Sequence, residues 1–405
     1  MLPVEITVGF ESGPLYQPMT GVANYTFNMV RASLEADSAL RFIGFGDLAS
    51  QRIDLAALNE IFTHKNQADQ KSVRDRGFSS SRLAVHAVHK LKKINVARVM
   101  YREVRRRNFL WNTSRQKLDL FHAYNFRPPA DPGVPILPVI YDLSTFRHPN
   151  FHPLERVKWL GGLVDTLASS PLVQTISEFS KREIVDVFAY PSEKILVAPP
   201  AAAPLFVPLG EDITQRDLDV YALHYADYIL AVGTLEPRKN LRTLVAAYAQ
   251  LTVAQRALCP LVVVGNAGWG ELKLPPLAET MVANGSLRFL SGISDRSLRS
   301  LYEGARLLAM PSIYEGFGMP VVEALACGTP VAHSAGTAMD EISGDFGERI
   351  SALDEDGWAA ALQSAMEGHG HADPGLRIQR TDRARQFDWA KSAEIVAGAY
   401  RNIAN

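Results

Sequence analysis

Short runs of apolar residues alternate along the chain with longer stretches in which apolar residues recur at helical spacing. The short runs are typical of buried strands, and the periodic stretches between them are typical of helices. The expected strands are 4–10, 40–45, 118–124, 135–140, 172–177, 194–200, 228–233, 261–265, 287–292 and 307–310, with another that ends near His333. Because helices join buried parallel strands, this pattern predicts an α/β fold with helices on both faces of the sheets.

The chain of 405 residues is long enough for two or three domains. Strands and helices alternate in both halves, and a stretch containing Pro204 and Pro208 separates the halves. An amphipathic segment ends the chain. We therefore expect a first Rossmann-like domain over residues 1–205, a linker over 206–225, a second Rossmann-like domain over 226–385 and a C-terminal helix over 386–405.

Composition narrows the classes of partner and compartment. The formal net charge is −1, so no overall positive field attracts nucleic acid. Cys259 and Cys327 lie far apart in apolar surroundings, which indicates core residues in a reducing cytoplasm rather than a disulfide or metal pair. Residues 1–10 read as a strand rather than a signal peptide, and no apolar run reaches the roughly 18 residues of a membrane span. We expect a cytoplasmic protein.

The apolar run 307–310 leads into a glycine-rich turn, a short helix and a glycine stop. Gly316 and Gly318 allow backbone amides to approach a ligand where a Cβ would clash. Pro320 suits the first helical position, since its missing N–H would be unpaired there. The helix N-terminus then directs N–H groups and a partial positive charge at the turn, which favours a phosphate.

Two glutamates flank this helix start. Glu315 lies in the turn and Glu323 lies one turn into the helix, so both side chains can face one ligand. A carboxylate accepts hydrogen bonds from two neighbouring hydroxyl groups, which suits a buried sugar. Two solvated glutamates on an ordinary strand–helix connection are the alternative, because short glycine motifs are weak evidence.

An arginine–lysine pair follows the first strand of the second half. Arg238 and Lys239 stand where that strand has ended and a helix is about to begin. Adjacent cations there favour a diphosphate, since arginine binds it as a fork and lysine as a point charge. The same charges would stabilise a departing diphosphate without a metal. The alternative is a solvated pair before a helix.

Polar residues also stand at strand ends in the first half, where open α/β sheets bind their ligands. Gly21 lies in the turn after the first strand, His122 ends the third, and Tyr141 and Asp142 follow the fourth. The alternative for His122 is a strand-end histidine bonded to a backbone carbonyl. Ser177 is expected as a helix N-cap, in a Ser-Glu-Phe-Ser segment that we interpret as architectural.

A strongly basic stretch runs from Lys90 to Arg107. Its only acid is Glu103, and its cations are Lys90, Lys92, Lys93, Arg98, Arg102, Arg105, Arg106 and Arg107. Apolar residues recur at helical spacing through it, which predicts an amphipathic helix with a cationic side. That side is either solvated or placed against an anionic membrane surface or a lipid pyrophosphate. Sparse aromatic residues and the lack of an RNA-binding motif argue against RNA.

In their order along the chain, these motifs resemble those of a known family. The Glu315–Glu323 segment resembles the E-x7-E signature of retaining GT-B glycosyltransferases of the family 4 type (glycosyl transferases group 1), which include bacterial polysaccharide mannosyltransferases. The segment around Arg238 and Lys239 is similar to the family's G-x-x-x-P-x-K-N block. The resemblance implies a GT-B fold: two Rossmann-like doubly wound domains facing a cleft, with the C-terminal helix crossing back onto the first domain.

The resemblance also implies roles for individual residues. The expected donor-binding residues are Gly21, Arg238, Lys239, Ile293, Glu315, Gly316, Phe317, Gly318, Met319 and Glu323. Within this set, Glu323 would bind the ribose, Glu315 the sugar, and Ile293 the base through its backbone. The expected catalytic residues are Tyr141, Asp142, Arg238, Lys239 and Glu315. Tyr141 stands where the family usually has the histidine of His-Asp-Leu-Ser, so Tyr141, Asp142 or His122 takes over its polar role.

The implied reaction is sugar transfer, with retention, from a nucleotide diphosphate sugar to a saccharide or lipid-linked saccharide acceptor. GDP-mannose is the first choice of donor, ahead of a rhamnose or glucose donor. No metal is expected, because Asp217-Leu218-Asp219 and Asp354-Glu355-Asp356 both lie away from strand ends. The alternatives are a nucleotide-sugar epimerase on the same fold and a non-catalytic two-lobed sugar-binding protein. A PLP-dependent phosphorylase is disfavoured, because such chains are usually much longer.

Overall fold

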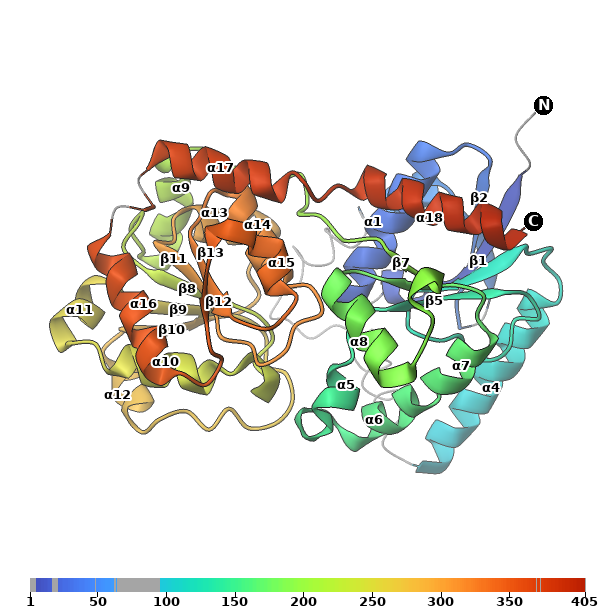
Figure 1. Cartoon of the computed structure of the whole chain (residues 1–405), viewed down its shortest axis with the longest axis horizontal. Helices are drawn as coiled ribbons and strands as arrows, with labels where there is room; N and C mark the ends of the chain where they lie inside the picture. Colours follow the sequence, from blue (N-terminus) through green and yellow to red (C-terminus); the bar gives the residue numbers. More distant parts are fainter. Residues whose placement is uncertain are drawn as a thin grey trace, which may run out of the picture.

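The computed structural model describes residues 5–16, 21–47, 49–61, 63, 95–368, 370–371 and 373–404. They form two lobes that lie side by side, each with a central sheet and covering helices (Figure 1). Apolar runs predicted to be strands form the sheet interiors. Every residue is buried in β4 (Leu120–Ala123), β9 (Leu261–Val264) and β11 (Leu307–Met310). This burial on both faces is typical of parallel α/β sheets.

The first lobe contains a seven-stranded sheet in the order β3-β2-β1-β4-β5-β6-β7. Its strands are β1 (Ile6–Glu11), β2 (Leu40–Phe45), β3 (Ser50–Ile53), β4 (Leu120–Ala123), β5 (Ile136–Ile140), β6 (Val173–Thr175) and β7 (Ile195–Val197). The pair β2–β3 is antiparallel, and the other pairs are parallel. The helices are α1 (Gly21–Ala36), α4 (Asn95–Thr113), α5 (Ser144–Arg147), α6 (Leu154–Gly161), α7 (Leu163–Ser169) and α8 (Glu178–Phe188), with the short 3-10 helices η1 (Gly13–Tyr16), η2 (Pro149–Phe151) and η3 (Ser192–Lys194).

The second lobe contains a parallel six-stranded sheet in the order β10-β9-β8-β11-β12-β13. Its strands are β8 (Ile229–Val232), β9 (Leu261–Val264), β10 (Leu287–Leu290), β11 (Leu307–Met310), β12 (Val331–Ser334) and β13 (Gly347–Ile350). Its helices are α9 (Glu211–Leu218), α10 (Leu241–Ala249), α11 (Val253–Leu258), α12 (Leu277–Ala283), α13 (Asp295–Glu303), α14 (Met319–Ala326), α15 (Met339–Ser343), α16 (Glu355–Glu367) and α17 (Pro374–Ala384), with η4 (Asp219–Tyr221), η5 (Pro237–Lys239) and η6 (Gly344–Phe346). Strands β8, β9 and β11 converge on the turns that carry the candidate site.

Much of the segment predicted to be a linker is helical. Helix α9 packs against α13, and Glu303 of α13 accepts hydrogen bonds from the N–H groups of Leu209 and Gly210 at 2.9 and 2.8 Å. Asp217, part of a candidate metal-binding pattern, accepts instead from Arg299 and Ser300. The segment before the second sheet is therefore fixed to the second lobe.

The final helix, α18 (Trp389–Ala404), returns to the first lobe and packs along α1 (Figure 1). Its Tyr400 hydroxyl lies 2.6 Å from Nδ1 of His122 on β4, and Ser392 donates to the carbonyl of Pro199 at 2.7 Å. This crossing agrees with the GT-B resemblance. None of the helices in the described ranges is long and apolar enough to cross a membrane, and Cys259 and Cys327 are free, buried thiols, as predicted.

Candidate active site

The glycine-rich turn between β11 and α14 forms where the sequence predicts it. Gly318 has a φ of 106°, and a Cβ there would lie 2.6 Å from Cγ of Met339, so only glycine is free of strain. Helix α14 starts at Met319, and Pro320 is its second residue. Phe317 is buried and anchors the turn. The unpaired N–H groups of the helix start are thereby held beside the turn.

Gly316 lies where the second lobe meets the first. A Cβ on Gly316 would lie 2.1 Å from the carbonyl oxygen of Tyr141 and 2.6 Å from the Cβ of Asp142. Both neighbours belong to the loop after β5 in the first lobe. The approach excludes any side chain at this position, so Glu315, the preceding residue, is fixed at the boundary between the lobes.

Glu315 brings together the two cations predicted from the sequence. Lys239 Nζ lies 2.6 Å from Oε1 of Glu315, and Arg238 Nη1 lies 3.1 Å from its Oε2. The side chains of Arg238, Lys239 and Glu315 are 12%, 19% and 9% exposed. The cluster is therefore largely shielded from water, where ion pairs are stronger than on an open surface.

The cations determine the charge of Glu315. Burial favours the neutral acid, but Arg238 and Lys239 outweigh burial and lower the pKa of Glu315 to about 2. Burial also opposes the charge of Arg238, whereas the carboxylates of Glu315, Asp142 and Glu236 raise its pKa above the ordinary value. Arg238 and Glu315 are therefore both ionised at neutral pH.

Glu236 is a site residue that the sequence analysis missed. Its Oε1 accepts from Nε and Nη2 of Arg238 at 3.0 and 2.7 Å, while Nη1 of Arg238 donates to the carbonyl of Tyr314 at 2.6 Å. Most donors of Arg238 are therefore committed to the protein. Lys239 has three N–H donors and one partner among the described residues, so it is the freer cation of the pair.

Asn240 fastens this cation segment to the glycine-rich turn. Its side-chain amide donates to the carbonyls of Pro311 and Ala352 at 3.0 and 2.6 Å. Its φ of 54° lies in the left-handed region, which asparagine tolerates better than most residues. The asparagine of the G-x-x-x-P-x-K-N block thus has a structural role here.

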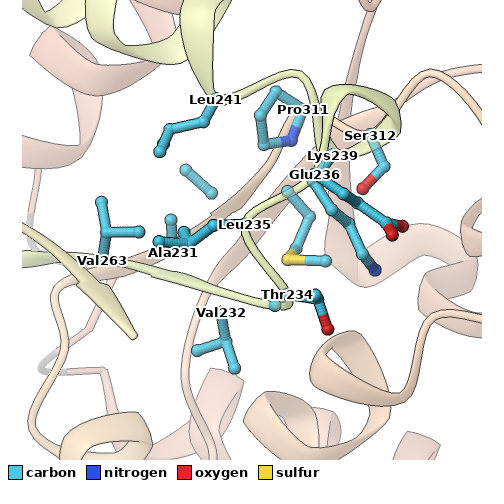
Figure 2. Close-up of a pocket in the computed structure, with 13 residues that line it drawn as sticks. Ala231, Val232, Thr234, Leu235, Glu236, Lys239, Leu241, Val263, Pro311 and Ser312 are labelled. Carbon is cyan, nitrogen blue, oxygen red and sulfur yellow. The ribbon is translucent and has the colours of Figure 1, made fainter. Parts of the chain in front are cut away.

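A cavity of about 20 Å³ lies beneath the turn that connects β8 to η5. Figure 2 shows Glu236, Lys239 and Ser312 grouped at one side of it, with Leu241 and Val263 among its apolar lining. This volume has room for about one water molecule. The cavity is therefore too small for a nucleotide sugar.

Glu323 lies one turn into α14, as predicted, but its surroundings differ from those of Glu315. Its Oε2 accepts a hydrogen bond from the Tyr302 hydroxyl at 2.8 Å. Burial, opposed only by that hydrogen bond and reinforced by Asp295, raises the pKa of Glu323 to about 8. Glu323 is consequently a mostly neutral acid at pH 7.

Two further predicted donor-binding residues lie at the starts of helices. Ile293 precedes α13, is partly buried, and is followed by Ser294, whose side chain caps the helix by accepting from the N–H of Ser297. Gly21 is the first residue of α1, and a Cβ there would meet no described heavy atom within 4 Å. Gly21 is thus open to a ligand, but no close packing in the described part of the chain requires glycine there.

Two of the three candidates for the missing family histidine are committed elsewhere. His122 is fully buried, its Nδ1 faces Tyr400, and burial lowers its pKa to about 3. Tyr141 is 8% exposed, and its hydroxyl donates to the carbonyl of Tyr124 at 2.8 Å. The Nδ1 of His122 and the hydroxyl of Tyr141 are therefore engaged by other residues of the protein, which favours Asp142 for the polar role of the family histidine.

Asp142 is the candidate that faces the second lobe. Its Oδ1 accepts from the N–H and the hydroxyl of Ser144 at 2.9 and 2.6 Å, which fixes the carboxylate. Its negative charge acts on Arg238 and on Tyr314, and its Cβ borders Gly316. The first lobe therefore places a carboxylate beside the cation cluster.

The sequence analysis also missed a contact across the lobes at Trp269. The indole Nε1 donates to the carbonyl of Phe151 at 2.6 Å. His152, whose ring lies 6.0 Å from that of Trp269, has both nitrogens buried without a hydrogen-bond partner in the described chain. Burial and the charge of Arg156 lower its pKa to about 4, and Asp142 and Arg238 also act on it. His148 and His152, four residues apart soon after Asp142, were the available signal.

Comparisons with known proteins agree with this architecture. The sequence model of the family described as glycosyl transferases group 1 matches residues 223–377, which include the cation pair and both glutamates. O-antigen chain mannosyltransferase B from Escherichia coli is 30% identical over 400 residues, covering 97% of this chain and 98% of the relative.

Solved structures show the same fold at low identity. Sucrose-phosphate synthase from Thermosynechococcus elongatus aligns with a TM-score of 0.70 and 16% identity, covering 98% of this chain and 99% of that chain. Anabaena HepE in complex with UDP-glucose aligns with a TM-score of 0.68 and 15% identity, covering 98% and 100%. The fold is GT-B, and the chain belongs to the glycosyl transferases group 1 family of glycosyltransferases.

Proposed function

We propose that this glycosyltransferase moves mannose from GDP-mannose to a saccharide or lipid-linked saccharide acceptor in surface-polysaccharide synthesis, with retention at the anomeric carbon. The observation that carries the proposal is the buried cluster in which Arg238 and Lys239 meet Glu315 at the start of α14. The choice of mannose rests on the relative named O-antigen chain mannosyltransferase B.

The second lobe would bind the donor. Lys239, with donors to spare beyond Glu315, takes the diphosphate together with the N–H groups of residues 316–319 at the start of α14. Glu315, ionised, accepts from hydroxyl groups of the sugar. Glu323 binds the ribose, and the backbone at Ile293 lies beside the base. Arg238 keeps Glu315 in place and adds positive charge.

Departure of the nucleoside diphosphate is the step that these cations assist. Negative charge grows on the leaving diphosphate, and preorganised cations in a shielded site stabilise it without a metal. Positive charge grows on the sugar at the same time. Asp142, whose carboxylate is held by Ser144, would face that charge from the first lobe. We assign Asp142 the polar role of the missing histidine. The acceptor hydroxyl then attacks the oxocarbenium-like sugar on the face from which the diphosphate departs, and its proton passes to an oxygen of the departing diphosphate.

A donor panel tests this proposal. Thermal shift with GDP-mannose, a GDP or UDP glucose donor and a dTDP-rhamnose donor is followed by transfer assays with a lipid-linked saccharide, read by mass spectrometry and NMR of the new linkage. We expect GDP-mannose to stabilise the protein most and to give an α-linked mannosyl product. A larger thermal shift with another donor would identify the sugar of that donor, rather than mannose, as the one transferred. Conversion of donor without an acceptor would identify an epimerase, and binding without any turnover a sugar-binding protein.

We also propose that α4 contacts the anionic inner face of the plasma membrane from the cytoplasm. Met100, Val104 and Trp111 are 64%, 53% and 58% exposed on this helix, and the guanidinium of Arg115 lies 3.8 Å from the ring centre of Trp111. Arg102, Arg106 and Arg107 are exposed nearby. Apolar side chains flanked by arginines suit a helix lying in a lipid interface.

Not every cation of the predicted basic stretch can be assigned to the exposed face of α4. Lys90, Lys92 and Lys93 fall outside the described residues, as does the side chain of Arg98. Arg105 is turned inward, where it pairs with Glu11 and with Asp47. The membrane proposal therefore rests on the outer face of α4 alone.

Vesicle flotation tests the membrane contact. Wild type is expected to bind vesicles containing phosphatidylglycerol, to detach in high salt and to ignore pure phosphatidylcholine. Replacing Arg102, Arg106 and Arg107 by glutamine is expected to weaken binding at least tenfold. A control replaces the exposed Arg242, Lys194 and Lys391 by glutamine. Equal loss in both triple variants would show a non-specific effect of net charge and reject α4 as the docking surface.

A further inference from the structure

The start of helix α8 touches the second lobe at two places. The N–H groups of Glu178 and Phe179 donate to the two carboxylate oxygens of Glu341 on α15, at 2.9 and 2.8 Å. First-turn N–H groups have no partner within their own helix, and a carboxylate at this end also meets the positive pole of the helix. Glu341 thus supplies, from the other lobe, the acceptors that α8 lacks.

The second contact reaches the sugar-binding turn itself. Ser177 and Ser180 both donate from their hydroxyl groups to the carbonyl of Gly316, at 2.7 and 3.2 Å. Gly316 follows Glu315, and its α-carbon region is pressed against Tyr141 and Asp142. One helix start therefore holds the turn that carries Glu315 against the loop that carries Asp142.

Glu341 is itself held at the point where the chain leaves the second lobe. Arg383, at the end of α17, donates to the carbonyl of Glu341, and its Nε donates to the carbonyl of Ile342 at 3.0 Å. The chain then crosses to α18 on the first lobe. Arg383 therefore holds Glu341 just before the chain crosses, and Ser392 holds α18 to the first lobe just after it.

We propose that Glu341 is a positioning residue: its contact with α8 docks the two lobes so that Glu315 and Asp142 are placed around the same sugar. The inference rests on the proposed function of these two carboxylates. Gly21 is the one expected donor-binding residue in the first lobe. The groups proposed to bind the diphosphate and ribose belong to the second lobe, so loss of the contact is expected to leave donor affinity nearly unchanged. Turnover alone needs the first lobe in place, and it should therefore fall.

The variants Glu341→Ala and Glu341→Gln test this split, with Asp345→Ala, an exposed carboxylate of the same lobe, as control. For Glu341→Ala we expect kcat to fall by roughly tenfold to a hundredfold, the scale of a small misplacement of reacting groups. GDP and UDP affinities, measured by calorimetry, should stay within about twofold. Glu341→Gln keeps one acceptor oxygen and should recover part of kcat, and Asp345→Ala should match wild type.

Hydrogen exchange gives a readout that needs no activity. First-turn amides normally exchange fast, so protection of Glu178 and Phe179 in wild type, lost in Glu341→Ala, would show the contact even if the sugar chemistry were assigned wrongly. Unprotected amides in wild type would overturn the inference. So would unchanged kcat in Glu341→Ala, or a joint loss of kcat, nucleotide affinity and melting temperature, which would indicate a general folding defect.

Discussion

The turn before α14 and the helix α14 itself carry one glutamate each, and the two carboxyl groups meet opposite surroundings. Glu315 in the turn touches two cations, and its pKa falls to about 2. Glu323 in the helix touches a tyrosine hydroxyl, and its pKa rises to about 8. Glu315 is buried and Glu323 is partly buried, and burial raises the pKa of both, so burial does not explain the difference. The partners do.

Those partners come from distant parts of the chain. Arg238 and Lys239 reach Glu315 from the turn after β8, whereas Tyr302 reaches Glu323 from α13. The spacing of the two glutamates predicts that they share a ligand, but it says nothing of their charge. One motif therefore presents a fixed anion and a neutral acid, suited to different parts of one donor.

Removing Lys239, which lies beside Glu315, is expected to have the largest effect on the contrast between Glu315 and Glu323. Lys239→Ala is expected to lower sugar transfer by more than about 100-fold, the scale of losing one charge-stabilising contact. It should also raise the pKa of Glu315 toward that of a buried acid. Initial rates at saturating donor and acceptor measure the effect.

A matched variant separates this role from general charge. Arg242→Ala removes an exposed cation three residues further along and should leave the rate unchanged. Transfer by Lys239→Ala within a few-fold of wild type would reject the role assigned to Lys239.

Neutralising Glu315 is expected to have a smaller effect. Glu315→Gln should lower transfer roughly tenfold to a hundredfold, because an amide accepts weaker hydrogen bonds than a carboxylate and leaves the cations underneutralised. The exposed Glu394→Gln serves as control. A variant with normal activity would place the sugar away from Glu315.

Glu315→Gln should also differ from wild type in its stability at acidic pH. The folded-state pKa of Glu315 is depressed below its ordinary 4.5, so its stabilising contribution is present above about pH 4.5 and is lost as pH falls toward 2. Glu315→Gln should lack this portion of the acid-induced loss of stability. Parallel acid-unfolding curves for the two proteins would contradict the depressed pKa.

Neutralising Glu323 should change activity least at pH 7, because the acid is already mostly protonated there. The folded-state pKa is raised, so the stabilising contribution is present below about pH 4.5 and is lost as pH rises toward 8. Glu323→Gln lacks the ionisable group, so its stability relative to wild type should rise between pH 5 and pH 8. Thermal melts at pH 5 and pH 8 measure this.

Donor binding sharpens the comparison further. If Glu323 accepts from the ribose hydroxyls, its ionisation above pH 8 should tighten donor binding in wild type by a few-fold, and Glu323→Gln should show a flat profile. Calorimetry with GDP between pH 6.5 and 9 gives the profile. A pH dependence that survives in the variant would have to come from another group.

The sequence predicted the buried strands well because these consist of apolar residues between turns. It missed β3 and β13, which are edge strands with the same exposed middle, Ser-Gln-Arg-Ile and Gly-Glu-Arg-Ile. An edge strand needs few apolar residues, so periodicity gives no signal. Helix α9 was also missed, because its attachment to the second lobe depends on Glu303, far along the chain.

The site shows the same division. Glu315 and Lys239 were predicted from local motifs, and the fold brings them into contact. The hydroxyl of Tyr141 donates to the carbonyl of Tyr124, a contact within the first lobe that no motif reveals. Glu236 and His152 matter through what surrounds them in space. Glu236 occupies an unspecified position of the G-x-x-x-P-x-K-N block, and the spacing of His148 and His152 does not reveal that the ring nitrogens of His152 are buried.

The return of α18 to the first lobe has a consequence for how the protein is made. Tyr400 covers His122, yet it leaves the ribosome just over 200 residues after the last strand of that lobe, β7. At roughly 5–20 residues per second, the nascent first lobe waits on the order of ten to forty seconds with this aromatic surface uncovered. Early chaperone engagement during translation is therefore the expected fate of the half-finished chain.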